Sequence, residues 1–126
     1  MSKKYNKIKG DKAETVAVNY LKLKGFSIVK TNFRLRSGEI DIIAKDKSND
    51  YIVFVEVKYR TTNRYGTPSQ AIDYRKIQKI RNTALAYLTF NNLHGKDVRF
   101  DVIEITDSYE FGNVPEYNIN HIKSAF

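Results

Sequence analysis

Two acidic residues and a lysine lie inside strongly hydrophobic segments of this chain. Asp41 lies in the segment GEIDIIA (residues 38–44), and Glu56 and Lys58 lie two positions apart in the segment YIVFVEVK (residues 51–58). Charged side chains are costly in such strands unless a partner compensates them. An acid followed by Glu-x-Lys on the next strand is the minimal set for metal-dependent hydrolysis of a phosphodiester. The carboxylates would hold Mg2+ or Mn2+, and the lysine would act on the attacking water.

The alternation of side chains along a strand predicts which of these groups share a face. Glu56 and Lys58 point the same way, together with Phe54 and Arg60, whereas Asp41 shares its face with Glu39 and Ile43. If the two strands are neighbours, the carboxylates of Asp41 and Glu56 come close enough to share a divalent cation. The alternative is a structural salt bridge between Lys58 and one of the carboxylates.

The elements that must position these residues follow from the hydrophobic pattern. Apolar residues recur at helical spacing from Gly10 to Lys24, and Gly25 ends that helix, with Glu14 at the edge of its apolar face. Thr67, Pro68 and Gln70 predict the capped start of a second, long helix. The predicted strands cover residues 26–30 and 33–36, with Thr31-Asn32 as an interruption, then 39–45, 51–60 and 98–106, and residues 107–126 are predicted to be rich in turns.

These elements predict an α/β fold in a single domain, residues 1–126. The order is helix, three-strand meander, helix, strand, which gives a mixed central sheet flanked by helices in a three-layer sandwich. With 126 residues, the chain is long enough for one substantial core.

The charge of the chain favours nucleic acid as a partner. Lysines and arginines number 22 against 14 aspartates and glutamates, a formal charge of +8. A generic basic protein remains the alternative. The chain has no cysteine, which excludes disulfides and thiolate zinc sites. The longest uncharged apolar run, residues 51–55, is too short to span a membrane, so no membrane partner and a cytoplasmic location are expected.

Four segments resemble, in order, the signature segments of the YraN family of small bacterial proteins. They are GEIDIIA (38–44), FVEVKYR (54–60), YGTP (65–68) and RFDV (99–102). The resemblance extends over nearly the whole chain. It implies a restriction-endonuclease-like fold of the PD-(D/E)XK type, related to archaeal Holliday junction resolvases.

The resemblance also implies roles for individual residues. The PD-(D/E)XK pattern implies Asp41 and Glu56 as metal acids, Lys58 as the catalytic lysine and the carbonyl of Val57 as an additional metal ligand. Glu14 matches the helix acid that completes the site in resolvase-like members. The chain departs from the usual Gly-x-x-Gly-Glu of the family, because alanine replaces the second glycine in GDKAE (10–14).

Further residues around this set are candidates for accessory or binding roles. Gln70 and Tyr74 resemble a Gln-x-x-x-Tyr element of some related nucleases, with helix capping and packing as the favoured alternative. His94 and His121 lack metal-ligand spacing and are predicted to be structural or solvated. The basic residues that flank the acids in sequence are candidate phosphate contacts, each with a solvated face as the alternative: Arg34, Arg36, Arg60, Arg64 and Lys76.

The sequence therefore leaves three functions open. The first is a Mg2+- or Mn2+-dependent endonuclease acting on DNA, with branched, Holliday-junction-like DNA as one substrate class. The second is a nucleic-acid-binding module on a nuclease fold, with weak or no catalysis. The third is a protein-interaction subunit that uses the aromatic residues Tyr5, Tyr109 and Phe111. The oligomeric state is open, with a homodimer as one option.

Overall fold

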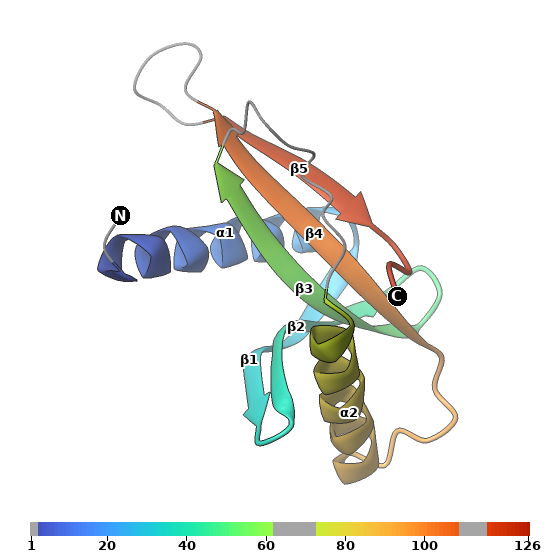
Figure 1. The fold of residues 1–126 in the computed structure, drawn as a ribbon. Helices are drawn as coiled ribbons and strands as arrows, with labels where there is room; N and C mark the ends of the chain where they lie inside the picture. Colours follow the sequence, from blue (N-terminus) through green and yellow to red (C-terminus); the bar gives the residue numbers. More distant parts are fainter. Residues whose placement is uncertain (1–2, 62–72, 109–115) are drawn as a thin grey trace.

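The described residues form a mixed five-stranded sheet with one helix on each face (Figure 1). The computed structural model describes residues 3–61, 73–108 and 116–126. The elements are α1 (Lys3–Leu23), β1 (Phe26–Leu35), β2 (Gly38–Asp46), β3 (Tyr51–Thr61), α2 (Tyr74–Phe90), β4 (Val98–Ser108) and β5 (Glu116–Ile122). The strands lie in the order β1-β2-β3-β4-β5. Strands β3 and β4 are parallel, and the other neighbouring pairs of these five described strands are antiparallel. The predicted α/β layering is therefore confirmed.

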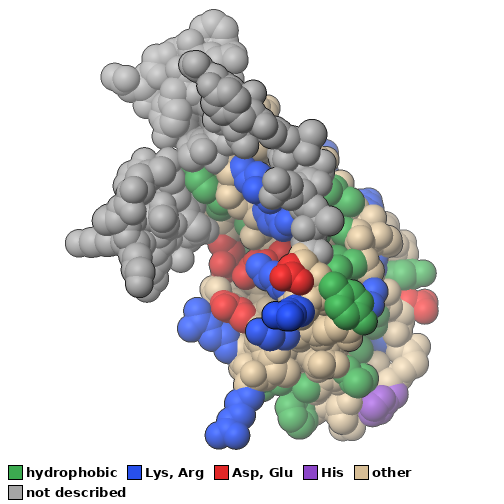
Figure 2. Space-filling model, in the orientation of Figure 1, with side chains coloured by type: hydrophobic (Ala, Val, Ile, Leu, Met, Phe, Trp, Pro, Cys, Tyr) green, Lys and Arg blue, Asp and Glu red, His purple; other side chains and the backbone are tan. Residues whose placement is uncertain are grey.

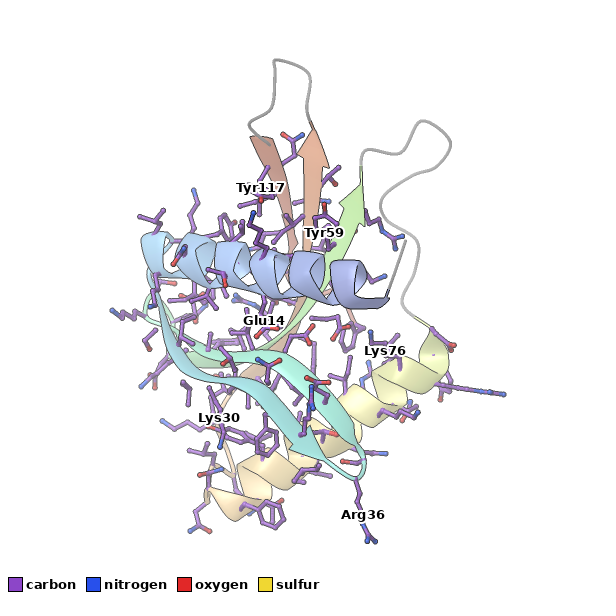
Figure 3. The ribbon with its side chains drawn as sticks, turned by 90° about the vertical axis from the view of Figure 1, so that its left-hand side faces the viewer. Glu14, Lys30, Arg36, Tyr59, Lys76 and Tyr117 are labelled. Atoms are coloured by element: carbon purple, nitrogen blue, oxygen red, sulfur yellow. The ribbon has the colours of Figure 1, made fainter. Side chains whose placement is uncertain are left out.

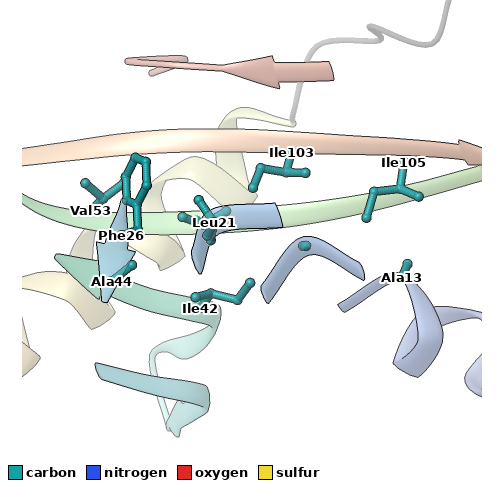
Figure 4. Packing of buried hydrophobic residues seen from close by; sticks show 10 residues of the cluster. Ala13, Leu21, Phe26, Ile42, Ala44, Val53, Ile103 and Ile105 are labelled. Atoms are coloured by element: carbon teal, nitrogen blue, oxygen red, sulfur yellow. The ribbon is translucent and has the colours of Figure 1, made fainter. Parts of the chain in front are cut away.

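The two helices bury their apolar faces on opposite sides of the sheet. Ala13, Ala17 and Leu21, four residues apart on α1, are at most 1% exposed and pack on one face (Figure 4). On the other face, α2 contributes residues at the same helical spacing, among them Ile80 and Ala84. The sheet serves both cores by alternation: Val53, Val55, Ile103 and Ile105 face α1, while Ile52 and Phe54 face α2.

Several boundaries differ from the prediction. The first helix begins at Lys3, and β1 runs without interruption from Phe26 to Leu35, with an irregular register between Ile28 and Lys30. Asn32 stays within the strand at a φ of 53°, in the left-handed region that asparagine tolerates. The turn signal at Thr31-Asn32 therefore marks a local distortion of the strand.

The C-terminal segment was predicted as turns but contains β5, an edge strand paired with β4. Its inward residues Tyr117 and Ile119 pack against the α1 core, while Asn118 and Asn120 are exposed. The polar outer face weakens the hydrophobic signal of this strand, which explains why the prediction of turns was wrong.

The start of the second helix also differs. The described helix begins at Tyr74, and Asp73 caps it by accepting a hydrogen bond from the Arg75 N–H at 2.9 Å. The predicted cap at Thr67, Pro68 and Gln70 lies outside the described residues, as does Arg64, and the same holds for the side chains of Tyr5, Tyr109 and Phe111. Within the described residues, neither helix is long and apolar enough to cross a membrane.

Candidate functional site

The site lies where β2 separates from β3. The β2–β3 pairing runs from Asp46–Tyr51 to Ile42–Val55, whereas β2 stays paired with β1 to Gly38. Asp41 is the first residue of β2 beyond the paired stretch, and Ile40 and Ile42 belong to different cores, so the alternation of β2 breaks at this point. Beyond the last paired residues, the Asp41 carboxylate accepts a hydrogen bond from the Val57 N–H at 2.8 Å, where a backbone carbonyl of β2 would otherwise accept it. Asp41 and Glu56 thus approach on neighbouring strands, but not as paired ladder residues.

Close packing against α2 fixes the position of the β1–β2 hairpin. Gly38 has a φ of 153°, and a Cβ at this position would lie 3.1 Å from the Cβ of Lys79 and 3.2 Å from Thr83 Oγ1. In the adjacent turn, the hydroxyls of Ser37 and Thr83 are hydrogen-bonded at 2.7 Å. The first turns of α2 are therefore held next to the acids of β2 and β3.

Asp41 is in an environment that disfavours its charge. Burial, followed by the negative charges of Glu56 and Glu14, raises its pKa to about 7 from the ordinary 3.8, against the opposing effect of the Val57 hydrogen bond. A carboxylate whose ionisation is opposed by neighbouring acids would be stabilised by a cation.

Glu56 is buried, with 5% of the residue exposed, and Lys76 on α2 forms an ion pair with its Oε1. Although burial alone would lower the pKa of Lys76, the hydrogen bond and charge of Glu56 raise it above the ordinary value. Lys76 also acts on Asp41, where its charge lowers the pKa. The space-filling view shows acidic and basic side chains intermixed where β2, β3 and the first turn of α2 meet (Figure 2). Lys76 was predicted as a phosphate contact, and the structure places it next to Glu56 and within reach of the charge of Asp41.

Lys58 lies on the same face of β3 as Phe54 and Glu56, as the alternation predicts. Burial and the nearby Arg60 lower its pKa, while Glu104, its register partner on β4, opposes that change. Glu104 is 3% exposed, and its Oε2 has no hydrogen-bond partner among the described residues, nor does the buried Nε of Arg60. Sequence reasoning assigned no role to Glu104. The signal was present, because Glu104 is a single acid between the buried residues Ile103 and Ile105.

Glu14 projects from α1 toward the β1–β2 hairpin (Figure 3). Its Oε1 accepts a hydrogen bond from Asn32 Nδ2 at 2.6 Å, and the two residues line a cavity of about 340 Å3 between α1 and β1. Its charge reaches Asp41, whose pKa it raises. In the described ranges, however, no three His, Cys, Asp or Glu side chains lie close enough to hold one metal ion. A ligand role for Glu14 therefore stays a prediction.

The remaining predicted residues are dispersed. Arg34 forms an ion pair with Glu39 at 3.1 Å, and Arg36 points away from the protein at the tip of the β1–β2 hairpin (Figure 3). Arg60 lies beside Lys58. Tyr74 is the first residue of α2 and is 70% exposed, while its predicted companion Gln70 is outside the described residues. Of the basic set, the structure thus brings Lys76 to the acids and places Arg60 beside Lys58.

The donor set suits a hydrated Mg2+ or Mn2+ ion. Asp41 and Glu56 offer carboxylate oxygens, and Mg2+ sites commonly use one or two carboxylates together with water and substrate phosphate oxygens. The N–H and carbonyl of one strand residue point to the same edge, so the Val57 carbonyl faces the edge at which Asp41 binds the Val57 N–H. The β2–β3 ladder has ended at this point, which leaves that carbonyl outside the ladder.

A second buried cluster of charges lies elsewhere on the sheet, and we call it the Asp101 cluster. Asp101 is fully buried and binds Arg99 at 2.9 and 3.1 Å, His121 at 2.7 Å and the Ser124 N–H at 3.0 Å. Arg99 also contacts Asp46 at 3.3 Å, and the hydroxyl of Tyr20 lies 3.1 Å from His121 Nδ1. The prediction that His121 is structural fits this position, in which both ring nitrogens have partners. Sequence reasoning did not foresee the cluster, because Tyr20, Asp46 and His121 are distant in the chain from Arg99 and Asp101.

Comparisons with known proteins place the chain in a family. The uncharacterised protein family UPF0102 matches residues 13–105. A UPF0102 protein of Clostridioides difficile (strain 630) is 47% identical over 121 residues, which cover 96% of this chain and 98% of the relative. A UPF0102 protein of Persephonella marina is 46% identical over 94% of this chain and 93% of its own length. One of Clostridium botulinum (strain Hall) is 48% identical over 96% and 95%. The chain therefore belongs to the uncharacterised protein family UPF0102.

Proposed function

We propose that this protein is a Mg2+- or Mn2+-dependent endonuclease of the restriction-endonuclease-like type that hydrolyses phosphodiesters in DNA, with branched, Holliday-junction-like DNA as the substrate class to test first. The observation that carries the proposal is the approach of Asp41 and Glu56 on neighbouring strands, where burial and then the charge of Glu56 raise the pKa of Asp41 to about 7. Acids held together in this way are frequent at functional sites.

In this proposal, the residues of the site would have distinct roles. Asp41, Glu56 and the Val57 carbonyl would hold the cation, which would supply an activated water and polarise the phosphate. Lys58, on the face of Glu56, would orient that water and neutralise negative charge that develops on the phosphate. The burial that lowers the pKa of Lys58 supports a role in proton transfer. Arg60 and Lys76 would contact the flanking phosphates.

A nucleic-acid-binding module without catalysis is the second candidate, and one observation favours it. Glu56 already has a counter-ion in Lys76, so the carboxylate does not require a metal to be stable. The formal charge of +8 serves a binder as well as an enzyme.

Cleavage assays on a panel of DNA structures separate the two candidates. Purified protein with Mn2+ would be incubated with single-stranded, duplex, flap and four-way-junction DNA, alongside Asp41→Asn and Glu56→Gln prepared identically. The enzyme predicts cleavage that falls by roughly a thousandfold or more in both variants, while DNA affinity persists and weakens steeply with salt. No metal-dependent cleavage of any structure, with salt-sensitive affinity intact, would favour the binder.

A further inference from the structure

Lys76 compensates a buried carboxylate that a cation would also compensate. Its side chain is 54% exposed, whereas that of Glu56 is 6% exposed, so a flexible surface residue reaches inward to a buried acid. Lys76 belongs to the first turn of α2, next to the sheet (Figure 3). A lysine stem has enough rotamers to leave such a pair without any change in the backbone.

One ammonium group serves both strand acids. Lys76 binds Glu56 directly and also lowers the pKa of Asp41 through its charge. One ammonium carries a single positive charge, whereas the two carboxylates carry two negative charges when both are ionised, so the ammonium alone compensates them incompletely. A divalent cation carries twice the charge and would compete for the same oxygens of Glu56.

A second position for the ammonium exists beside the acids. Lys76, together with Arg75 and Lys79, lines a groove of about 380 Å3 at the start of α2. The acids of this groove have other partners, because Glu39 pairs with Arg34 and Asp73 caps the helix. The groove therefore offers three cationic side chains to an anion, and phosphate is the anion that a DNA strand presents.

We propose that Lys76 is an internal counter-ion that competes with the divalent cation for Glu56 and that, once the cation binds, turns to the groove and contacts a substrate phosphate. This inference rests on the proposed function. Lys76 would then couple metal binding to DNA binding. Without the cation it stays paired with Glu56, and with the cation bound it becomes available to a phosphate.

Calorimetric titration of Mn2+ into the whole protein tests the competition directly. Lys76→Met keeps the length of the stem and removes the charge. Lys79→Met is the matched control, because Lys79 lines the same groove and, in the described structure, is not paired with Glu56. We expect Lys76→Met to bind Mn2+ roughly tenfold more tightly than the wild type, and Lys79→Met to stay within about twofold of it. Equal affinity in Lys76→Met and the wild type, or the same gain in both variants, would overturn the inference.

A measurement on the wild type makes the test independent of whether a variant folds. The side-chain ammonium resonance of Lys76 should change when Mg2+ is added, while that of Lys79 stays constant, and an unchanged Lys76 resonance at saturating Mg2+ would contradict release. DNA affinity tests whether the released lysine contacts a phosphate. The loss of DNA affinity from wild type to Lys76→Met should be larger in Ca2+ than in a chelator, because Lys76 is released from Glu56 only when the cation is bound.

These outcomes separate the inference from the proposed function. If Asp41→Asn abolishes Mn2+ binding but Lys76→Met leaves it unchanged, the metal site stands and the role of Lys76 fails. If Lys76→Met binds more tightly but no DNA is cleaved, Lys76 competes with the cation as inferred and the nuclease proposal fails. If neither protein binds Mn2+, both fail.

Discussion

The Asp41–Glu56 site and the Asp101 cluster are both groups of buried charges on the same sheet, yet their acids are partnered differently. Each carboxylate oxygen of Asp101 has at least one partner, from Arg99, His121 or the Ser124 N–H. Although burial alone would raise the pKa of Asp101, these hydrogen bonds hold it below the ordinary value. In the Asp41–Glu56 site the pKa of Asp41 is raised to about 7, and the nearby Glu104 Oε2 has no hydrogen-bond partner in the described part of the chain.

This difference predicts different roles for the two groups of buried charges. A satisfied buried network contributes to a single well-ordered fold. A buried group that is incompletely satisfied lowers stability, and it persists where another property, such as ligand binding, depends on it. We therefore expect substitutions in the Asp101 cluster to change mainly stability, and substitutions in the Asp41–Glu56 site to change mainly cation binding and chemistry.

The largest effect is expected for Asp101→Asn. The substitution leaves the buried guanidinium of Arg99 with an incomplete counter-charge, so the free energy of unfolding should fall by roughly 3–5 kcal/mol. Urea denaturation measures it, and Lys45→Gln, which breaks the exposed pair with Asp50, is the control with an expected loss below about 1 kcal/mol. Similar small losses in both variants would remove the contrast between the two regions.

Lys58→Ala comes next. If Lys58 acts on water and on charge that develops in the transition state, cleavage should slow by roughly a hundredfold or more, with little change in DNA affinity. Lys22→Ala, which removes an equal charge from an exposed position on α1, should leave the rate unchanged. A loss of affinity in Lys58→Ala without any effect on a cleavage rate would assign Lys58 to binding.

The pH dependence of stability should have opposite signs in the two regions. The folded-state pKa of Asp41, about 7, lies above its ordinary value of 3.8, so Asp41 lowers the stability of the metal-free protein as the pH rises between those values. The folded-state pKa of Asp101 lies below the ordinary value, so its carboxylate stabilises the fold at pH values above the ordinary pKa. This stabilisation is lost as the pH falls through the folded-state pKa. Asp41→Asn keeps an acceptor for the Val57 N–H, and it should raise the free energy of unfolding by on the order of 1–3 kcal/mol at about pH 8 and have little effect at about pH 4. The same gain at both pH values would contradict a titrating Asp41.

The smallest effect is expected for Glu104→Gln. Glu104 raises the pKa of Lys58 against the effects of burial and Arg60, so its neutralisation should lower that pKa further. A side-chain nitrogen titration of Lys58 measures the change, with the exposed Lys22 as an internal reference. An unchanged pKa of Lys58 would show that Glu104 does not influence it.

The sequence predicts the parts of this molecule that depend on local periodicity. The faces of β3, the helix that carries Ala13, Ala17 and Leu21, and the adjacency of Asp41 and Glu56 all follow from spacing along one or two neighbouring segments. The ion pair of Lys76 with Glu56 and the Asp101–His121 contact do not, because each joins residues about twenty positions apart across different elements. The sequence pattern also does not predict the separation of β2 from β3 at Asp41, which lies in the hairpin that packs on α2 through Ser37 and Gly38.

The most direct test is the unfolding free energy of the wild type and of Asp41→Asn at about pH 8, each measured with Mn2+ and with a chelator. If Asp41 and Glu56 are held together to bind a cation, the order of stability should reverse: the Asn variant should be the more stable protein in the chelator, and the wild type in Mn2+. A wild type that Mn2+ does not stabilise, or the same order under both conditions, would contradict a metal site at these two carboxylates.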